Sequence, residues 1–273
     1  MLNKIKFGVA ALTLGLGLLA STSPIEALSI EEIQEKGELV VGTNAEYPPM
    51  EWVIIEDGES KIVGVDVELA QAIADELGVE MVLDNRAFDA LIPTLQTKKV
   101  DIVIAGMAET EERAKVVDFS DTYYQSSGQI SVLEENLDQY ETIEDFNGKK
   151  VGALKGSIQE SYLRDNHPEI ELVSLGGTGE LFEAVRAKKV DGALVDMITT
   201  GQYLTQYEDI ARVESIEIEN EDSEGSAVAA PKDSDELIAL INEVIAEKQE
   251  SGEIDEWFDT YLELSGKELA DGE

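Results

Sequence analysis

The chain lacks cysteine and carries a single histidine, and both shortages narrow its chemistry. Without cysteine there is no disulfide, no thiolate metal site and no cysteine nucleophile. His167 lies in a polar turn between Asn166 and Pro168, where we expect it to be exposed and idle. One such histidine does not support Ser–His–Asp catalysis or a histidine-based zinc site. GxxxxGK[ST] and GxGxxG motifs are also missing, so we expect neither a nucleotide cofactor nor a metal.

Basic residues are scarce: 20 Lys and Arg against 59 Asp and Glu give a net charge of −39. Such a chain repels nucleic acid and anionic membrane surfaces, so we expect no nucleic-acid partner. The acids are spread along the chain, which predicts a solvated acidic surface of the kind that suits concentrated salt. The acidic stretch 217–225 (EIENEDSEG) lacks the spacing of a calcium loop.

Long apolar runs are confined to the start of the chain. Lys4 and Lys6 precede an uncharged stretch over 7–20 and a segment of small residues, the pattern of an export signal. We predict that residues 1–27 are this signal, with cleavage after Ala20 as an alternative. The protein would then work in the periplasm or at the outer face of the cytoplasmic membrane. Ser21 cannot accept the lipid that some exported binding proteins carry on cysteine.

Strand-like apolar runs alternate with helical patterns along the rest of the chain, which indicates an α/β fold with mostly parallel sheets. Asp66 could cap a helix that Gly78 ends. The last helix carries an apolar stripe that we expect to pack in the core, and residues 267–273 should be a frayed tail. Further helices are expected at 89–98, 157–166, 179–188 and 198–208, and strands at 39–44, 79–84, 149–154, 170–175 and 226–231.

An internal echo divides the chain into two similar units. QTKKVDIVIAGM (96–107) returns as RAKKVDGALVDM (186–197), each time after a helix and before a polar corner. In open α/β sheets ligands bind at the C-terminal ends of strands, so both copies should face one cleft. Because no flexible linker separates the units, we predict two lobes joined by crossovers at 124–132 and 216–227. The predicted boundaries are 28–127 and 223–266 for lobe 1 and 128–222 for lobe 2.

One charged residue follows the first copy of the echo, and another stands at the end of the second copy. Arg113 could grip a carboxylate bidentately; alternatively it is a surface arginine paired with Glu109 or Glu112, a contact worth little. Asp196 ends an apolar run and could accept from an ammonium group; alternatively it caps the helix that follows, and the two roles can coexist. A cation and an anion facing one cleft would suit a zwitterionic small molecule.

Aromatic residues flank the same predicted corners. In GTNAEYPPMEW (42–52) a rigid Pro-Pro stands between Tyr47 and Trp52, and Phe88 opens another strand-to-helix corner. Aromatic faces of this kind could sandwich an aliphatic or cationic side chain. For Trp52 and Phe88 ordinary core packing is the alternative. The backbone N–H groups of Gly156 and Ser157 at a helix start offer a generic seat for an anion.

In these segments the sequence resembles the type II periplasmic, or extracytoplasmic, solute-binding proteins for polar amino acids, which are capture subunits of ABC importers. The resemblance covers about 37–264 and rests on GTNAEYPPMEW, VGVDVELAQAIADELG, FDALIPTLQTKKVDIVIAGM, TEERAKVVDFSDTYY and GKKVGALKGS, which follow in the family's order. It implies two lobes, each a mostly parallel sheet flanked by helices, joined by two crossover segments.

The resemblance also implies how the ligand's head group is held. Arg113 would grip the α-carboxylate, helped by the backbone at Ala108 and Ser157. Asp196 would take the α-ammonium together with the Gly106 carbonyl. The family usually carries Ser or Thr where this chain has Ala108, so one hydroxyl contact is missing.

For the rest of the ligand the resemblance points to five further positions. Tyr47 and Phe88 would sandwich the side chain. Either Thr110 would compensate for the missing hydroxyl, or the affinity would be lower. Asn44 stands where members that bind basic side chains or glutamine often carry Asp, with Glu46 nearby. With no Lys or Arg near the side-chain pocket, arginine, lysine or glutamine fits better than an acidic ligand.

The function that follows is capture of an L-amino acid by hinge closure and delivery to an ABC transporter permease, without catalysis or cofactor and as a monomer. One alternative is a dehydratase acting on a prephenate-like acid on the same fold. Another is a ligand-sensing receptor subunit, which would have to signal through a partner.

Overall fold

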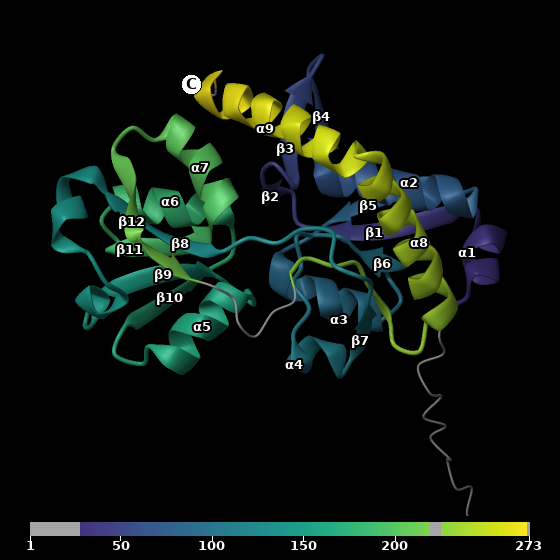
Figure 1. Ribbon diagram of the computed structural model, residues 1–273, viewed down its shortest axis with the longest axis horizontal. Helices are drawn as coiled ribbons and strands as arrows, with labels where there is room; N and C mark the ends of the chain where they lie inside the picture. Colours follow the sequence, from purple (N-terminus) through teal and green to yellow (C-terminus); the bar gives the residue numbers. More distant parts are fainter. Residues whose placement is uncertain (1–27, 219–224, 272–273) are drawn as a thin grey trace, which may run out of the picture.

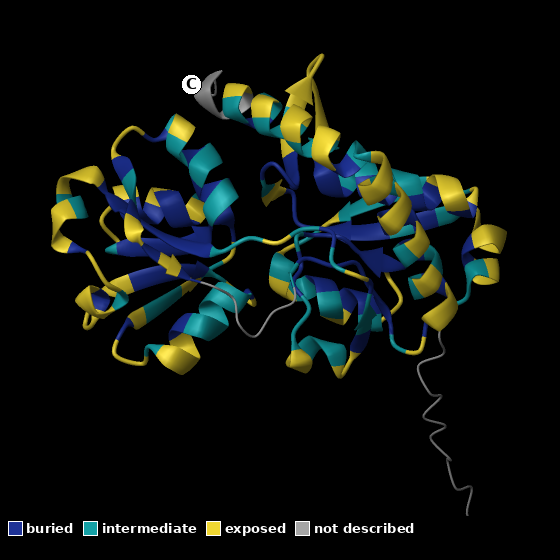
Figure 2. Cartoon of the chain, viewed as in Figure 1, coloured by how far each residue is buried: buried dark blue, intermediate teal, exposed yellow. Residues whose placement is uncertain are grey.

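Two α/β lobes lie side by side in the computed structural model, which describes residues 28–218 and 225–271 (Figure 1). The predicted export signal, residues 1–27, lies outside the described residues. Within the described ranges no helix is both long and apolar enough to cross a membrane. Buried residues gather in the sheets and on the inner sides of the helices, and exposed residues cover the outside (Figure 2).

Lobe 1 is built on a five-stranded sheet with the order β5-β1-β6-β13-β7. β1 pairs in parallel with β5 and β6, whereas β13 runs antiparallel to β6 and β7. The strands are β1 (Glu38–Thr43), β5 (Glu80–Asn85), β6 (Ile102–Val103), β7 (Val117–Phe119) and β13 (Ala229–Pro231).

Helices cover both faces of this sheet, which explains why its strands read as continuous apolar runs. Along β1, Leu39 and Val41 pack with the apolar side chains of the helices on one face, and Val40 packs with those on the other. The helices are α1 (Ile30–Lys36), α2 (Val65–Leu77), α3 (Leu91–Gln96), α4 (Glu111–Ala114), α8 (Asp235–Ser251) and α9 (Glu253–Asp271), with a 3-10 turn at Phe88–Ala90.

Helix α2 has the predicted end but not the predicted cap. Gly78 ends it in the left-handed conformation, with φ 71°. The expected N-cap at Asp66 is wrong, because Gly64 is the N-cap and Asp66 lies in the first turn. Its carboxylate turns inward instead, accepting from the backbone N–H of Gly106 and the hydroxyl of Tyr123. A side chain that looked like a local cap is therefore used for a long-range contact.

Between β1 and α2 the chain forms a small antiparallel sheet that we did not expect. Its strands are β2 (Glu46–Tyr47), β3 (Glu51–Glu56) and β4 (Glu59–Val63), in the order β2-β3-β4. Asp57 and Gly58 form the turn from β3 to β4, both with positive φ, as expected of a two-residue hairpin loop.

Lobe 2 repeats the plan with the sheet order β10-β9-β11-β8-β12. β9 pairs in parallel with β10 and β11, and β8 runs antiparallel to β11 and β12. Its elements are β8 (Gly128–Leu133), β9 (Lys150–Leu154), α5 (Ile158–Asn166), β10 (Glu171–Leu175), α6 (Thr178–Arg186), β11 (Gly192–Asp196), α7 (Met197–Gln206) and β12 (Ile210–Ile218), with 3-10 turns at Glu134–Gln139 and Ile143–Phe146.

The chain passes between the lobes twice, from β7 to β8 and from β12 to β13. In each sheet the antiparallel strand is the one that follows a crossover, β8 in lobe 2 and β13 in lobe 1. Lobe 1 thus contains chain from before and after lobe 2, and the predicted fold class is confirmed. Because residues 219–224 fall in the second crossover, the predicted lobe boundaries stay a prediction.

The sequence echo corresponds to a repeated backbone motif. Lys98 and Lys188 both adopt the left-handed conformation, at φ 53° and 55°, where a helix turns into the next strand. After each turn the carboxylate of an aspartate accepts a hydrogen bond from a backbone N–H of the neighbouring strand. Asp101 accepts from the Val40 N–H at 2.7 Å, and Asp191 accepts from the Lys150 N–H at 2.8 Å. The echo therefore records one helix-to-strand connection used once in each lobe.

Helix α9 is longer than the sequence indicated. It continues to Asp271, through residues that we expected to fray. Its apolar stripe packs on the lobe 1 core as predicted, and its far end reaches α7 of lobe 2 (Figure 1). There the Ser265 hydroxyl bonds to Oε1 of Gln202 at 2.9 Å.

Candidate functional site

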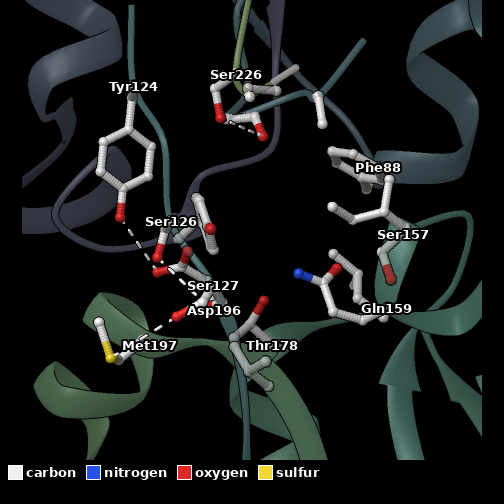
Figure 3. A pocket seen from close by; sticks show the side chains of 18 of the residues that line it. Phe88, Tyr124, Ser126, Ser127, Ser157, Gln159, Thr178, Asp196, Met197 and Ser226 are labelled. Atoms are coloured by element: carbon white, nitrogen blue, oxygen red, sulfur yellow. Dashed lines mark hydrogen bonds between the residues drawn. The ribbon is translucent and has the colours of Figure 1, made fainter. Parts of the chain in front are cut away.

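A cleft of about 450 Å³ lies between the lobes, with walls from both lobes and from both crossovers (Figure 3). Of the eleven residues proposed from the sequence, eight line it: Asn44, Tyr47, Phe88, Gly106, Ala108, Arg113, Ser157 and Asp196. They lie at the C-terminal ends of strands or in the segments that follow them, where ligands of open α/β sheets bind. That these residues hold a ligand remains a prediction.

Arg113 provides the cation of the cleft. Thr110 caps α4 by accepting from the Arg113 backbone N–H at 3.2 Å. The guanidinium donates to the carbonyl of Ala108 and, across the cleft, to that of Gly156 at 2.9 Å, and it lies 5.5 Å from the centre of the Phe88 ring. Burial lowers the pKa of Arg113 to about 10. Because this value is still well above neutral pH, the guanidinium stays charged.

Asp196 is both buried and fixed. It caps α7, with Oδ1 accepting from the N–H groups of Ile198 at 2.9 Å and Thr199 at 3.1 Å, so the capping role is present. The Tyr124 hydroxyl lies 3.5 Å from the same oxygen. Burial raises the pKa of Asp196, and hydrogen bonds from Ser126 and the helix start oppose this rise. The carboxylate stands across the cleft from Phe88 and Ser157 (Figure 3).

The aromatic and helix-start candidates lie on the cleft wall. The Tyr47 ring packs so closely on Gly106 that a Cβ there would come within 2.6 Å of it. Phe88 is half-buried and faces the cleft (Figure 3). Ser157 caps α5, its hydroxyl accepting from the Glu160 N–H at 3.1 Å.

Three candidates do not line the cleft. Trp52 is 5% exposed and meets Tyr261 edge-on, with ring centroids 5.8 Å apart, the core role that was its alternative. Glu46 is exposed, and its carboxylate lies against Gly177 of lobe 2. A Cβ added to Gly177 would come within 2.2 Å of Oε2 of Glu46. The Thr110 hydroxyl is engaged in capping α4.

Glu51 is a cleft residue that the sequence analysis missed. It lines the cleft with 0% exposure, and neither carboxylate oxygen has a hydrogen-bond partner among the described residues. Burial raises its pKa well above the usual range, and the nearby Asp66 raises it further. The only sequence signal is an acid directly after Pro-Pro-Met, at the start of an otherwise apolar strand.

His167 is less exposed than we expected, and its ring is hydrogen-bonded. It is half-buried at the C-terminal end of α5, and its Nε2 bonds to the Tyr162 hydroxyl at 2.9 Å.

The lobes touch on two sides of the cleft. On one side, Lys155 of lobe 2 pairs with Asp89 of lobe 1 at 2.8 Å. On the other, the Thr199 hydroxyl donates to the carbonyl of Pro48 at 2.9 Å, and the Tyr203 hydroxyl lies 3.3 Å from the carbonyl of Glu46. These contacts describe lobes closed on each other around the cleft.

Two lobes joined by two crossovers, with opposite charges on facing walls, define a clamp-like binding protein. The chain belongs to the bacterial extracellular solute-binding proteins, family 3, whose sequence model matches residues 39–264. The family predicted from the sequence is confirmed.

Relatives within this family carry names that specify amino acids. The chain is 34% identical to the arginine-binding extracellular protein ArtP of Bacillus subtilis over 229 residues, 82% of this chain and 87% of ArtP. In structure it is similar to AbpA of Streptococcus pneumoniae bound to L-arginine, with TM-score 0.83 and 37% identity over 86% of this chain and 98% of that one.

A third similar structure bears on the enzyme alternative. It is an ancestral amino acid-binding protein described as a precursor of cyclohexadienyl dehydratase, with TM-score 0.76 and 29% identity over 85% of this chain and 99% of that one. Binding proteins and an enzyme lineage therefore share this fold.

Proposed function

We propose that this protein captures a cationic L-amino acid, L-arginine foremost, outside the cytoplasm and delivers it to the permease of an ABC importer. The observation that carries this proposal is the charge of the cleft. One guanidinium, Arg113, stands among three carboxylates, Glu51, Asp196 and Glu217. A zwitterionic head group would neutralise Arg113 and Asp196. Glu217 and the Glu51 carboxyl, whose ionised form a nearby cation stabilises, then favour a ligand with a second positive charge.

The head group would bridge the two lobes. Arg113 on lobe 1 would pair with the α-carboxylate, and Asp196 on lobe 2 would accept from the α-ammonium, with the Gly106 carbonyl as a second acceptor. Charge-assisted hydrogen bonds of this kind contribute roughly 1.5–3 kcal/mol each. Two of them, one on each lobe, are of the size needed to shift a hinge from mostly open to mostly closed, about 5.5 kcal/mol.

The side chain would run between Tyr47 and Phe88 toward Glu51. An unpartnered buried carboxyl is costly, and an opposite charge nearby favours its ionised form. A guanidinium would supply both the charge and the missing hydrogen-bond donors. The arginine-binding names of ArtP and AbpA support this choice. Lysine would satisfy the charge, and glutamine would leave Glu51 without a counter-ion.

The permease would recognise the closed form of the protein. The cross-lobe contacts at Lys155, Thr199 and Tyr203 would form only when the lobes meet, so ligand binding would add to them and select the closed form. We propose that the protein does this as a monomer held at the outer face of the membrane, as expected of an extracellular solute-binding protein.

We propose capture rather than turnover. An amino-acid head group would engage both Arg113 and Asp196 in binding, which favours capture over their use as an acid and a base. Loss of water and carbon dioxide from prephenate or arogenate, monitored by the ultraviolet absorbance of the aromatic product, would contradict this proposal.

A thermal-shift screen of the L-amino acids tests the capture function. We expect arginine to raise the Tm most, lysine less, and aspartate and glutamate not at all. Arg113→Ala should lose the shift for every ligand, because truncating one partner of a buried charge pair costs about 2–5 kcal/mol. Arg164→Ala is the matched control, since Arg164 is exposed and its guanidinium bonds to Asp165 and Ser161 of its own helix. A full shift with Arg113→Ala would remove this residue from the site.

A further inference from the structure

Gly106 is fixed in the cleft wall by two residues that no sequence pattern singled out for this purpose. Its N–H donates to Oδ2 of Asp66 at 2.7 Å, and its carbonyl accepts from the Ser226 hydroxyl at 3.0 Å. Asp66 is 2% exposed and Ser226 is 7% exposed. Both ends of one glycine are thus held by buried side chains, one from α2 and one from the second crossover.

The glycine itself has little freedom. Its φ of +53° is in the left-handed region, and a Cβ would come within 2.6 Å of the Tyr47 ring. Asp66 is fixed in turn, because its other oxygen accepts from the Tyr123 hydroxyl at 2.9 Å. The direction of the Gly106 carbonyl is therefore set by packing and by two hydrogen bonds.

Ser226 connects this carbonyl to the hinge. Its backbone N–H donates to Tyr124 of the first crossover at 2.8 Å, and the N–H of Ala227 donates to Met107 at 2.9 Å. The second crossover therefore lies between the first crossover and the loop that carries Gly106. A displacement of the loop that carries Gly106 would therefore be passed through these hydrogen bonds to the crossovers that join the lobes.

We propose that Asp66 and Ser226 are positioning residues that aim the Gly106 carbonyl at the ligand's α-ammonium, so that they set the preference for a free α-amino group. A carbonyl oxygen has two lone pairs. Ser226 occupies one, and the other is left for the cleft that Gly106 lines. The inference rests on the proposed capture of an amino acid and adds the residues that recognise its amine.

The test compares L-arginine with 5-guanidinopentanoate, which keeps the carboxylate and the guanidinium but lacks the α-amino group. Calorimetry gives the affinity for arginine, and competition against arginine gives that for the analogue. We expect Ser226→Ala to weaken arginine binding about tenfold and analogue binding less than twofold. Ser226→Thr keeps the hydroxyl and should restore most of the arginine affinity.

A neighbouring serine provides the control. Ser120, on the first crossover, is buried at 5% exposure, and its hydroxyl accepts at 2.9 Å from the N–H of Val228, which lies two residues after Ser226. Ser120→Ala should leave the ratio of the two affinities unchanged. Equal losses for both ligands in Ser226→Ala, or no loss for either, would overturn the positioning role. Failure of the unaltered protein to bind arginine at all would instead overturn the proposed function.

Discussion

Asp196 shows how one side chain at this cleft serves both the fold and the site. Its carboxylate caps α7, and the same capping bonds hold it in the cleft wall. Arg113 is held in a similar way by two backbone carbonyls and by the cap of its own helix. Charges fixed in this manner need little reorganisation when a ligand arrives, which lowers the entropic cost of binding.

Asp66 makes the stability of the ligand-free protein depend on pH. Burial raises its pKa to about 6, against the lowering effect of the Gly106 and Tyr123 hydrogen bonds. A raised pKa means that the folded state holds the proton more tightly than the unfolded state. The contribution of Asp66 to stability is therefore full below about pH 4 and is lost as the pH rises through 6, by roughly 3 kcal/mol at most.

Asp66→Asn removes this titration. Relative to the unaltered protein, we expect the variant's free energy of unfolding to improve between about pH 4 and about pH 6 and to level off above about pH 7. Urea unfolding at several pH values measures the difference, and Asp259→Asn, at an exposed position of α9, controls for the loss of one charge. A difference that does not change with pH would show that Asp66 is not a buried acid of this kind.

How far the site could be predicted varies from residue to residue. Arg113 and Asp196 follow short local patterns, a capped turn and the end of a buried strand, so their neighbourhood was visible in the sequence. Glu51 and Ser226 were not, because their burial depends on elements far away in the chain. Trp52 and Glu46 each stand next to a cleft residue on their strand, Glu51 on β3 and Tyr47 on β2, and successive side chains of a strand point to opposite faces.

Among the elements, regular alternation was predicted and local exceptions were not. Long helices with four-residue apolar spacing and strands buried on both faces are where the sequence indicated them. The hairpin of β3 and β4 was missed although Asp57-Gly58 is a strong turn signal, because the apolar run before it resembles part of a buried strand. The length of α9 depends on its contact with α7, which no local pattern records.

Gly64, the N-cap of α2, links this helix to the hairpin. Its φ is +137°, and a Cβ would lie 2.0 Å from the carbonyl oxygen of Met50. Gly64→Ala should therefore displace the backbone and cost well over the ~1 kcal/mol of an ordinary glycine replacement. The free energy of urea unfolding measures the loss.

Gly58 is the matched control for this prediction. It also has positive φ, at +84°, but nothing lies within 4 Å of the position of its Cβ. Gly58→Ala should cost only about 1 kcal/mol. Equal losses at the two glycines would mean that backbone conformation alone, and not the contact with Met50, decides the cost.

For the molecule as a whole, charge is the dominant feature. With 59 acidic against 20 basic residues, self-repulsion opposes the compact state. Added salt shortens the Debye length from about 10 Å at 0.1 M to about 3 Å at 1 M. The Tm should therefore rise between 0.1 and 2 M NaCl, and by more than it does with sucrose of equal osmolality. A flat or falling Tm would show that repulsion is not limiting.

The central claim is that the charges of the cleft select a cationic amino acid. Its most direct test is calorimetric titration with L-arginine and with L-citrulline, which has nearly the same shape but a neutral side chain. We predict one site that binds arginine at least about tenfold more tightly, and we predict that Glu51→Gln removes most of this preference, since a charged hydrogen bond contributes roughly 1.5–3 kcal/mol. Equal affinity for the two ligands in the unaltered protein, or no heat with either, would contradict the account.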